Sequence, residues 1–474
     1  MLDDFQQKLR REAQLWRDEG LISSSQYQDL AERYRFNNLE AAARDRFGMM
    51  VISIGGILLF LGVITFVAAN WQAWSREVKF ILMMSLFLST SITGFYTWIP
   101  VKQSNNERNK QQQGRRILGE GLLILSAFIF GANIVLMAQI FNINGSIPEL
   151  FFAWGFGVLV MAYFLSLNSL GIMAIVLIQI GYWTGRGDLW YTSSDWNWVR
   201  LAVRHMPLLS WLLFVPLAYF CRSRWIFVLA SVVFAVTLQL NLNPLPLLNF
   251  SDMAPWVASF ALALPPALFW SYDDLLFPTV NYRLFQPLAR NLALIFFGLV
   301  FYALSFRWQW VAPSFNSFFP SNNTNFSMSL PVIDLGILSG LAVLQWLSLL
   351  RLRNNPPRRE LIFTIAVVTT FLAFIIITPF WHLAITRIDE LGSFMFNVLL
   401  AFLAAGLIRE GMKLNDRRTF WGGMLLLTLQ IISRVIEYDT DILFQSLVFF
   451  LCGSALISAG LWFERRLPAG SRNS

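Results

Sequence analysis

The third apolar run of the chain, residues 117–141, contains three polar side chains that could do chemistry inside a membrane: Glu120, Asn133 and Gln139. It costs free energy to place an ionisable or amide group in lipid. A residue that carries such a group inside an apolar run is therefore a candidate functional residue. Small residues, among them Ser126, fall on one helical face at a spacing of seven, which favours close helix packing. We expect all three side chains to face the protein interior as a candidate intramembrane polar site.

Each of these residues also has a purely structural interpretation. Glu120 lies about one turn inside the run, where it could form an ion pair with Arg116 at i−4. Asn133 and Gln139 could be hydrogen-bonding residues that join helices without binding a ligand. The sequence leaves both interpretations open, because a path for a substrate and a packed helix interface use the same residue types.

The sequence lacks the common motifs of enzymes and metal sites. Its only histidines, His205 and His382, and its only cysteines, Cys221 and Cys452, form no cluster along the chain. No H-E-x-x-H, C-x-x-C, P-loop or G-x-S-x-G pattern occurs. We therefore predict no catalytic residue, no metal site and no cofactor, and we expect a protein that is not an enzyme.

Composition places the chain in a membrane. Of its 474 residues, 56% are hydrophobic and 14% are charged, whereas soluble domains contain about 25% charged residues. The 19 Trp and 44 Phe residues suit interfacial and lipid-facing positions. The net charge of +8 is interpreted as a signal for membrane orientation. Membrane lipids are therefore the predicted partners, and a nucleic-acid partner is not expected.

A series of apolar runs predicts an all-α, polytopic integral membrane helix bundle with about 14 transmembrane helices. The runs cover about residues 48–69, 78–99, 117–141, 150–167, 169–183, 206–220, 225–240, 254–270, 288–306, 330–350, 361–380, 393–408, 419–436 and 442–463. Runs 169–183 and 206–220 are short for a full crossing. Run 254–270 contains Pro265 and Pro266, so it could be kinked or re-entrant.

The first run has the pattern of a helix that packs closely against another helix. Small residues recur in it every seven positions, at Gly48, Gly55, Gly62 and Ala69. Lipid supplies no hydrophobic force between helices, so such a stripe marks a packing face. The run ends in Asn70 and Trp71, which form an interface motif at the depth where indole rings gather.

Residues 1–47 are predicted to form a cytoplasmic helical hairpin ahead of the first run. Apolar residues repeat on one helical face up to Gly20, which suits the end of a helix. Ser23 and Gln26 have the spacing of a capping box, which starts a second helix. The hairpin could pack only on itself, or it could dock a protein partner, and the sequence leaves both alternatives open.

The distribution of Lys and Arg predicts the orientation of the bundle. If the N-terminus is cytoplasmic and the runs alternate, 28 of the 36 Lys and Arg residues fall on the cytoplasmic side. The clusters at 102–116, 351–359 and 409–418 all fall there, as the positive-inside rule requires. We therefore expect a protein of the cytoplasmic (inner) membrane with both termini in the cytoplasm.

Three separated segments resemble one known family. They are WRDEGLISSSQYQDL at 16–30, FVAANW at 66–71 and LGEGLLILSAFIFGANIVLMAQIFNING at 118–145. In this order they resemble the bacterial membrane protein family named domain of unknown function 2157, over roughly residues 10–183. The resemblance implies a membrane region at 48–183 and an inner-membrane setting, but no reaction. Residues 184–474 are predicted to form a separate C-terminal membrane region.

Two classes of function follow from these features. The first is a transporter- or flippase-like protein in which the polar face at 117–141 lines a path. The second is a non-transporting membrane scaffold or sensor with the hairpin as its docking module. Neither a substrate nor an oligomeric state follows from the sequence.

The predicted orientation can be tested with single cysteines at Asn323 and Asn355, after Cys221 and Cys452 are replaced by serine. In intact cells a cysteine at 323 should react with a membrane-impermeant thiol reagent, because the segment after run 288–306 is predicted to face outward. A cysteine at 355 should react only after the membrane is opened. Labelling at 355 together with protection at 323 would reverse the orientation.

Overall fold

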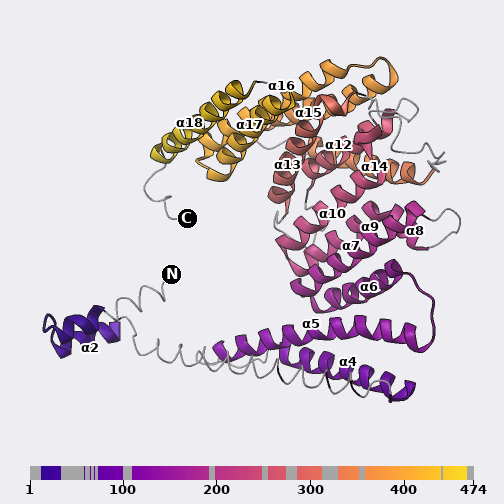
Figure 1. Ribbon diagram of the computed structural model, residues 1–474, viewed down its shortest axis with the longest axis vertical. Helices are drawn as coiled ribbons and strands as arrows, with labels where there is room; N and C mark the ends of the chain where they lie inside the picture. The colour runs from indigo at the N-terminus through magenta and orange to yellow at the C-terminus, as the bar shows by residue number, and fades with distance from the viewer. Residues whose placement is uncertain are drawn as a thin grey trace. The chain divides into compact units, whose positions relative to one another are not determined.

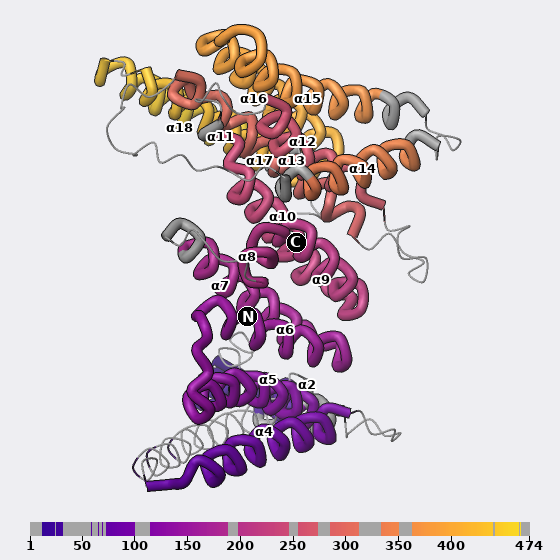
Figure 2. The backbone as a smooth tube through the Cα atoms, turned by 90° about the vertical axis from the view of Figure 1, so that its right-hand side faces the viewer, coloured from indigo at the N-terminus to yellow at the C-terminus, as the bar shows by residue number. Residues whose placement is uncertain are grey.

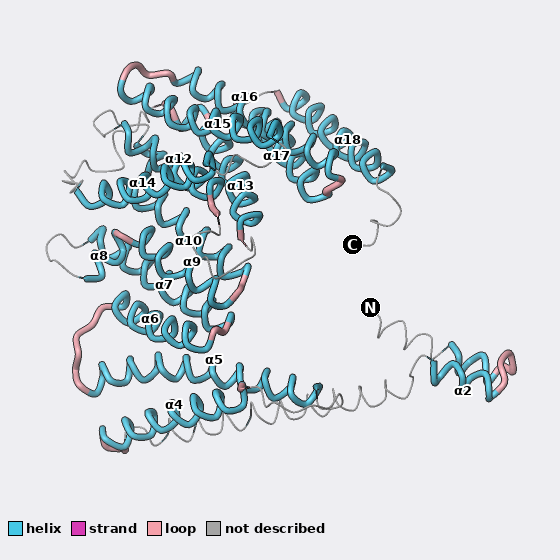
Figure 3. Tube along the Cα trace, turned by 180° about the vertical axis from the view of Figure 1, so that it is seen from behind, coloured by secondary structure: helices cyan, strands magenta, loops and turns pink. Residues whose placement is uncertain are grey.

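The computed structural model describes residues 12–33, 73–99, 109–191, 198–247, 255–273, 285–311, 329–351, 358–438 and 441–466, with isolated positions between 58 and 69. Within these ranges the regular elements are helices, and short loops join them (Figure 1, Figure 3). The predicted all-α class is therefore confirmed. The chain divides into two compact units, Met1–Leu88 and Ser89–Ser474.

The first unit contains the predicted hairpin. Residues 12–18 are helical, and the amide of Leu21 donates to the carbonyl of Trp16 over 2.8 Å where this helix ends. Gly20 has φ +74°, a conformation that glycine adopts without strain. The pattern closes the last turn and redirects the chain, as the position of Gly20 in the sequence predicts.

The second helix of the hairpin, α2 (Ser24–Arg33), begins with the predicted capping box. The amide of Ser23 donates to Gln26 Oε1 over 2.9 Å, and the amide of Gln26 donates to Ser23 Oγ over 3.2 Å. The guanidinium of Arg17 lies 4.9 Å from the centre of the Tyr27 ring, which joins the two helices. Local sequence signals thus account for this hairpin.

The helix α4 (Arg76–Trp98) begins in the first unit and ends in the second. The other helices belong to the second unit. They are α5 (Asn109–Ile140), α6 (Ile147–Leu165), α7 (Asn168–Tyr191), α8 (Trp198–Arg204), α9 (Met206–Cys221), α10 (Arg224–Leu242), α11 (Pro244–Leu247), α12 (Pro255–Ser271), α13 (Gln286–Leu304), α14 (Ser329–Arg351), α15 (Arg358–Ala384), α16 (Asp389–Leu414), α17 (Arg417–Glu437) and α18 (Ile442–Arg466), with a 3₁₀ turn η3 (Arg307–Gln309).

Ten helices of the described chain are long and apolar enough to cross a membrane, or 11 if the bent pair α8–α9 is one span. The predicted count of about 14 is therefore not confirmed. The first predicted run, 48–69, and the motif Asn70-Trp71 lie outside the described residues, apart from isolated positions. The helix α12 has 17 residues, and the apolar part of α14 is Ile333–Leu349, so both are shorter than the ten spans.

The three runs whose crossing was in question form three different kinds of helix. Run 169–183 belongs to α7, whose apolar part Asn168–Gly187 has 20 residues and is long enough to cross. Run 206–220 corresponds to α9, which has 16 residues and follows α8 after a bend of 76°. Run 254–270 forms α12, a helix that continues through both of its prolines rather than a re-entrant loop.

The second unit has two large apolar clusters, and α10 contributes to both. The N-terminal half of α10, with Phe227 and Ala230, packs in a cluster built mainly from α5 to α9. Its C-terminal half, with Phe234 and Leu238, packs in a cluster built from α12 to α16. Figure 2 shows α10 between the group of α6, α7 and α9 and the group of α12 and α13. Because α10 is shared, changes on it act on both clusters.

The helix α12 is buried almost all round, yet it contains two prolines. Pro265 has no N–H, so the carbonyl of Ala261 loses its helical donor. The side-chain amide of Gln239 on α10 replaces that donor, with Nε2 lying 2.7 Å from the Ala261 oxygen. Inside a membrane no water can do this, so α10 stabilises the proline-containing helix directly.

We predict that Gln239→Leu lowers the free energy of unfolding by about 1 kcal/mol, because it leaves the Ala261 carbonyl without a donor. In a Pro265→Ala background, residue 265 supplies the donor again, so Gln239→Leu should have little effect. Thermal unfolding of the four proteins in detergent measures both steps. An equal loss in the two backgrounds would show that Gln239 does not substitute for the missing N–H.

Candidate functional site at a broken helix

The predicted polar residues of α5 occupy three different environments. Glu120 is half-buried, and its Oε1 accepts a 2.6 Å hydrogen bond from Ser169 Oγ on α7. The sequence suggests an ion pair between Glu120 and Arg116, but the two described side chains do not form one. Glu120 therefore joins two helices within the bundle and does not pair along its own helix.

Asn133 and Gln139 lie further along α5. Asn133 is 6% exposed, and its Nδ2 donates to the carbonyl of Ile129 on the same helix over 3.0 Å. Gln139 is exposed, so the expected interior position does not apply to it. Thirteen residues of helix, about 20 Å, separate Glu120 from Asn133. The structure thus does not bring the three predicted residues together.

The buried face of α5 packs against α6 through a tryptophan. Trp154 Nε1 donates to the carbonyl of Ala127 over 2.8 Å, and the indole ring lies directly against Gly131. A side chain at Gly131 would occupy the space of that ring. This part of the predicted polar face of α5 is therefore a helix–helix contact within the described chain. The expected contact with the stripe of the first run lies outside the described residues.

A second polar site, which sequence interpretation did not identify, lies where α8 meets α9. The two short helices are bent by 76°, and His205 stands between them. Pro207 is the second residue of α9, so the carbonyl of Val203 has no helical donor. Asn241 on α10 replaces it, because its Nδ2 lies 2.9 Å from the Val203 oxygen and 3.0 Å from the Arg204 oxygen.

The amide of Asn241 is itself oriented by α7. Its Oδ1 accepts a 2.7 Å hydrogen bond from the hydroxyl of Tyr182 and a 3.3 Å bond from Arg186 Nη1. Tyr182 is fully buried, and Arg186 is partly buried. These bonds fix which end of the amide faces the break, so the two freed carbonyls of α8 meet a donor. The break is therefore stabilised by specific hydrogen bonds from α7 and α10.

His205, at the break, is bonded to a buried acid on another helix. Its Nδ1 lies 2.6 Å from Asp334 Oδ1 on α14, and the two side chains are 18% and 4% exposed. An ionised Asp334 can accept this bond only from the tautomer of His205 that carries its proton on Nδ1. A carboxylate inside an apolar helix is costly unless it is paired, and paired acids of this kind mark proton or substrate pathways in membrane proteins.

The sequence did contain a signal for this site. Asp334 is an acid inside the apolar run 330–350, and His205 is one of two histidines, two residues before a proline. The pairing could not be predicted, because 129 residues separate the two side chains along the chain. Nothing local indicates which helix stands opposite the break.

A third polar group, at the end of α13, is a structural connection between helices. Arg434 and Glu437 on α17, which are three residues apart on one helical face, form an ion pair. The carbonyl of Ser305, just after α13, accepts hydrogen bonds from three side chains: Ser393 Oγ, Asn397 Nδ2 and Arg434 Nη1. These bonds join the end of α13 to α16 and α17, which is a stabilising role.

The helices of the described chain define a polytopic α-helical membrane protein. Residues 14–171 match the family described as "Predicted membrane protein (DUF2157)", which confirms the resemblance carried by the three sequence segments. Membrane integration is indicated by this match and by the apolar helices together. No curated protein and no solved structure matches the chain. His205, Asn241 and Asp334 lie outside the matched residues.

Two glycines of α5 provide a matched test of the packed face. Gly131→Leu should lower the free energy of unfolding by about 1–3 kcal/mol, because the new side chain collides with the Trp154 ring. Gly121→Leu on the same helix should have little effect, since open space surrounds Gly121. Thermal unfolding in detergent compares them. Equal stability of the two variants would contradict the packing of α5 on α6.

Proposed function

We propose that the protein is a transporter- or flippase-like protein, and not an enzyme, of the bacterial inner membrane with both termini in the cytoplasm. The observation that carries the proposal is the buried His205–Asp334 pair at the α8–α9 break, with a separation of 2.6 Å. Many secondary transporters bind substrates and ions at broken helices, and paired ionisable residues inside a membrane mark such pathways.

The pair supplies a bond that a transport cycle could open and close. It joins the start of α9 to α14, and the two helices also contact each other. A proton on Asp334 would remove the negative charge from this bond and weaken it, and a cationic group of a substrate could displace His205 from Asp334. A rotation of α9 about His205 would cost few helical bonds, because the carbonyls of Val203 and Arg204 bond to Asn241 on α10 and not to amides of α9.

Motion at this contact can be detected with two matched cysteines in a protein whose Cys221 and Cys452 are replaced by serine. Ser210, one turn beyond His205 on α9, and Ser259 on α12 are both fully buried, and each donates to a carbonyl of its own helix. Residue 210 is buried in the packing of α9, so it becomes accessible only if α9 moves away from its neighbours. Ser210→Cys should react with an impermeant thiol reagent, and Ser259→Cys should stay protected.

Asp334→Asn should accelerate labelling at residue 210, because it removes the charge that holds His205. Protection of both cysteines, with and without Asp334→Asn, would contradict an opening at the break and would favour the second candidate.

The second candidate is a membrane scaffold or sensor that uses the N-terminal hairpin to dock a protein partner. Leu15 and Leu21 of the hairpin are 47% and 69% exposed, and exposed apolar side chains on a self-capped hairpin suit a partner surface. The packed contact of Trp154 on Gly131 also fits a static bundle. This role requires no opening between α9 and α14, so the labelling experiment separates the two candidates.

A further inference from the structure

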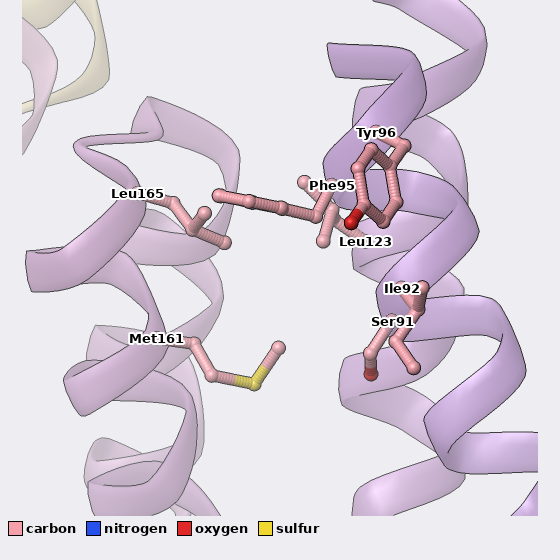
Figure 4. A pocket seen from close by; sticks show the side chains of 7 residues that line it. All are labelled: Ser91, Ile92, Phe95, Tyr96, Leu123, Met161 and Leu165. Atoms are coloured by element: carbon pink, nitrogen blue, oxygen red, sulfur yellow. The ribbon is translucent and has the colours of Figure 1, made fainter. Parts of the chain in front are cut away.

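An apolar crevice lies between α4, α5 and α6, within the second unit. It has a volume of about 450 Å³, in the range of roughly 300–1,000 Å³ that is typical of ligand sites. Figure 4 shows Met161 and Leu165 of α6 across from side chains of α4. The lining residues are Ser91, Ile92, Phe95, Tyr96, Leu123, Met161 and Leu165.

The floor of the crevice is fixed by close packing of α4 on α5. A Cβ at Gly94 would lie 3.0 Å from the side chain of Leu123, so the two helices touch at this point. About two turns further along α5, the ring of Phe130 lies against Gly157 of α6. These two glycine contacts hold α4 and α6 against the same helix, and the crevice is the space between their side chains.

The walls of the crevice have the chemistry of a hydrocarbon site. Ile92, Phe95 and Tyr96 are 54%, 43% and 67% exposed, so they face the surroundings of the bundle rather than its core. Ser91 Oγ is buried and has no hydrogen-bond partner in the described chain. Every other lining side chain except Tyr96 is purely apolar. A flexible apolar chain suits these walls, because the hydroxyls of Ser91 and Tyr96 are the only polar side-chain groups among the lining residues.

One end of the crevice is basic. Tyr96 is two residues before Trp98, the last residue of α4, and both ring types favour the depth of the lipid headgroups. Arg115 on α5 reaches this end, because its Nη2 donates to the carbonyl of Tyr96 over 3.2 Å. Arg116 is its exposed neighbour. The cluster at 102–116 is predicted to be cytoplasmic, so this end belongs to the inner leaflet.

We propose that the crevice binds an anionic phospholipid of the inner leaflet, with one acyl chain along Phe95, Ile92 and Met161. The headgroup phosphate lies at Arg115 and Arg116. The proposed occupant fits both halves of the site, since the walls are apolar and the rim carries two positive charges. The proposal does not depend on transport, because a static scaffold would hold the same lipid.

Native mass spectrometry of the full chain tests the proposal after delipidation in detergent. The probes are palmitoyl-oleoyl phosphatidylglycerol, which is anionic, and palmitoyl-oleoyl phosphatidylcholine, which is zwitterionic. The wild-type protein should prefer phosphatidylglycerol. Arg115→Gln and Arg116→Gln should each weaken its binding roughly fivefold and leave phosphatidylcholine binding unchanged, because each removes one charge near the phosphate.

The acyl-chain site is tested by filling it. Met161→Trp should abolish retention of both lipids, whereas Val160→Trp, at an exposed neighbouring position on α6, should not change it. Leu165→Phe provides a second, smaller obstruction if Met161→Trp lowers the yield of folded protein, and it should weaken both lipids. Equal lipid binding by the variants at 160, 161 and 165 would overturn the chain site. An unchanged preference in the arginine variants would overturn the headgroup assignment.

Discussion

A carbonyl that loses its helical donor to a proline must find another donor, and inside a membrane water cannot supply it. In this bundle α10 supplies it twice. Gln239 donates to the carbonyl freed by Pro265 in α12, and Asn241 donates to the carbonyl freed by Pro207 at the α8–α9 break. Because the two amides are two residues apart on one helix, α10 connects both irregular helices and both apolar clusters.

This constraint explains why the bundle can carry a break near a buried acid. The backbone cost of the bend is offset by Asn241, so the side chain of His205 is free to bond across to α14 rather than cap its own helix. Asp334 in turn keeps a hydrogen-bonded partner in an apolar setting. The crevice between α4, α5 and α6 is formed differently, beside the close contacts at Gly94 and Gly157, and its lining shares no residue with the break.

Features encoded by neighbouring residues could be predicted, whereas features made by distant residues could not. The capping box at Ser23, the helical runs and the family resemblance all follow from local patterns, and the structure or the family match confirms them. Gln139 was expected inside but is exposed, because a seven-residue stripe does not fix where a helix face ends. The partner of Asp334 depends on which helices become neighbours, and helical periodicity contains no such information.

The coupling free energy between His205 and Asp334 tests the central claim most directly, namely that this pair joins the broken helix to α14. It follows from unfolding measurements on the wild type, His205→Gln, Asp334→Asn and the double variant in one detergent. A hydrogen bond to a charged group predicts a coupling of about 1.5–3 kcal/mol. Additive effects, with a coupling below about 0.5 kcal/mol, would contradict the pairing.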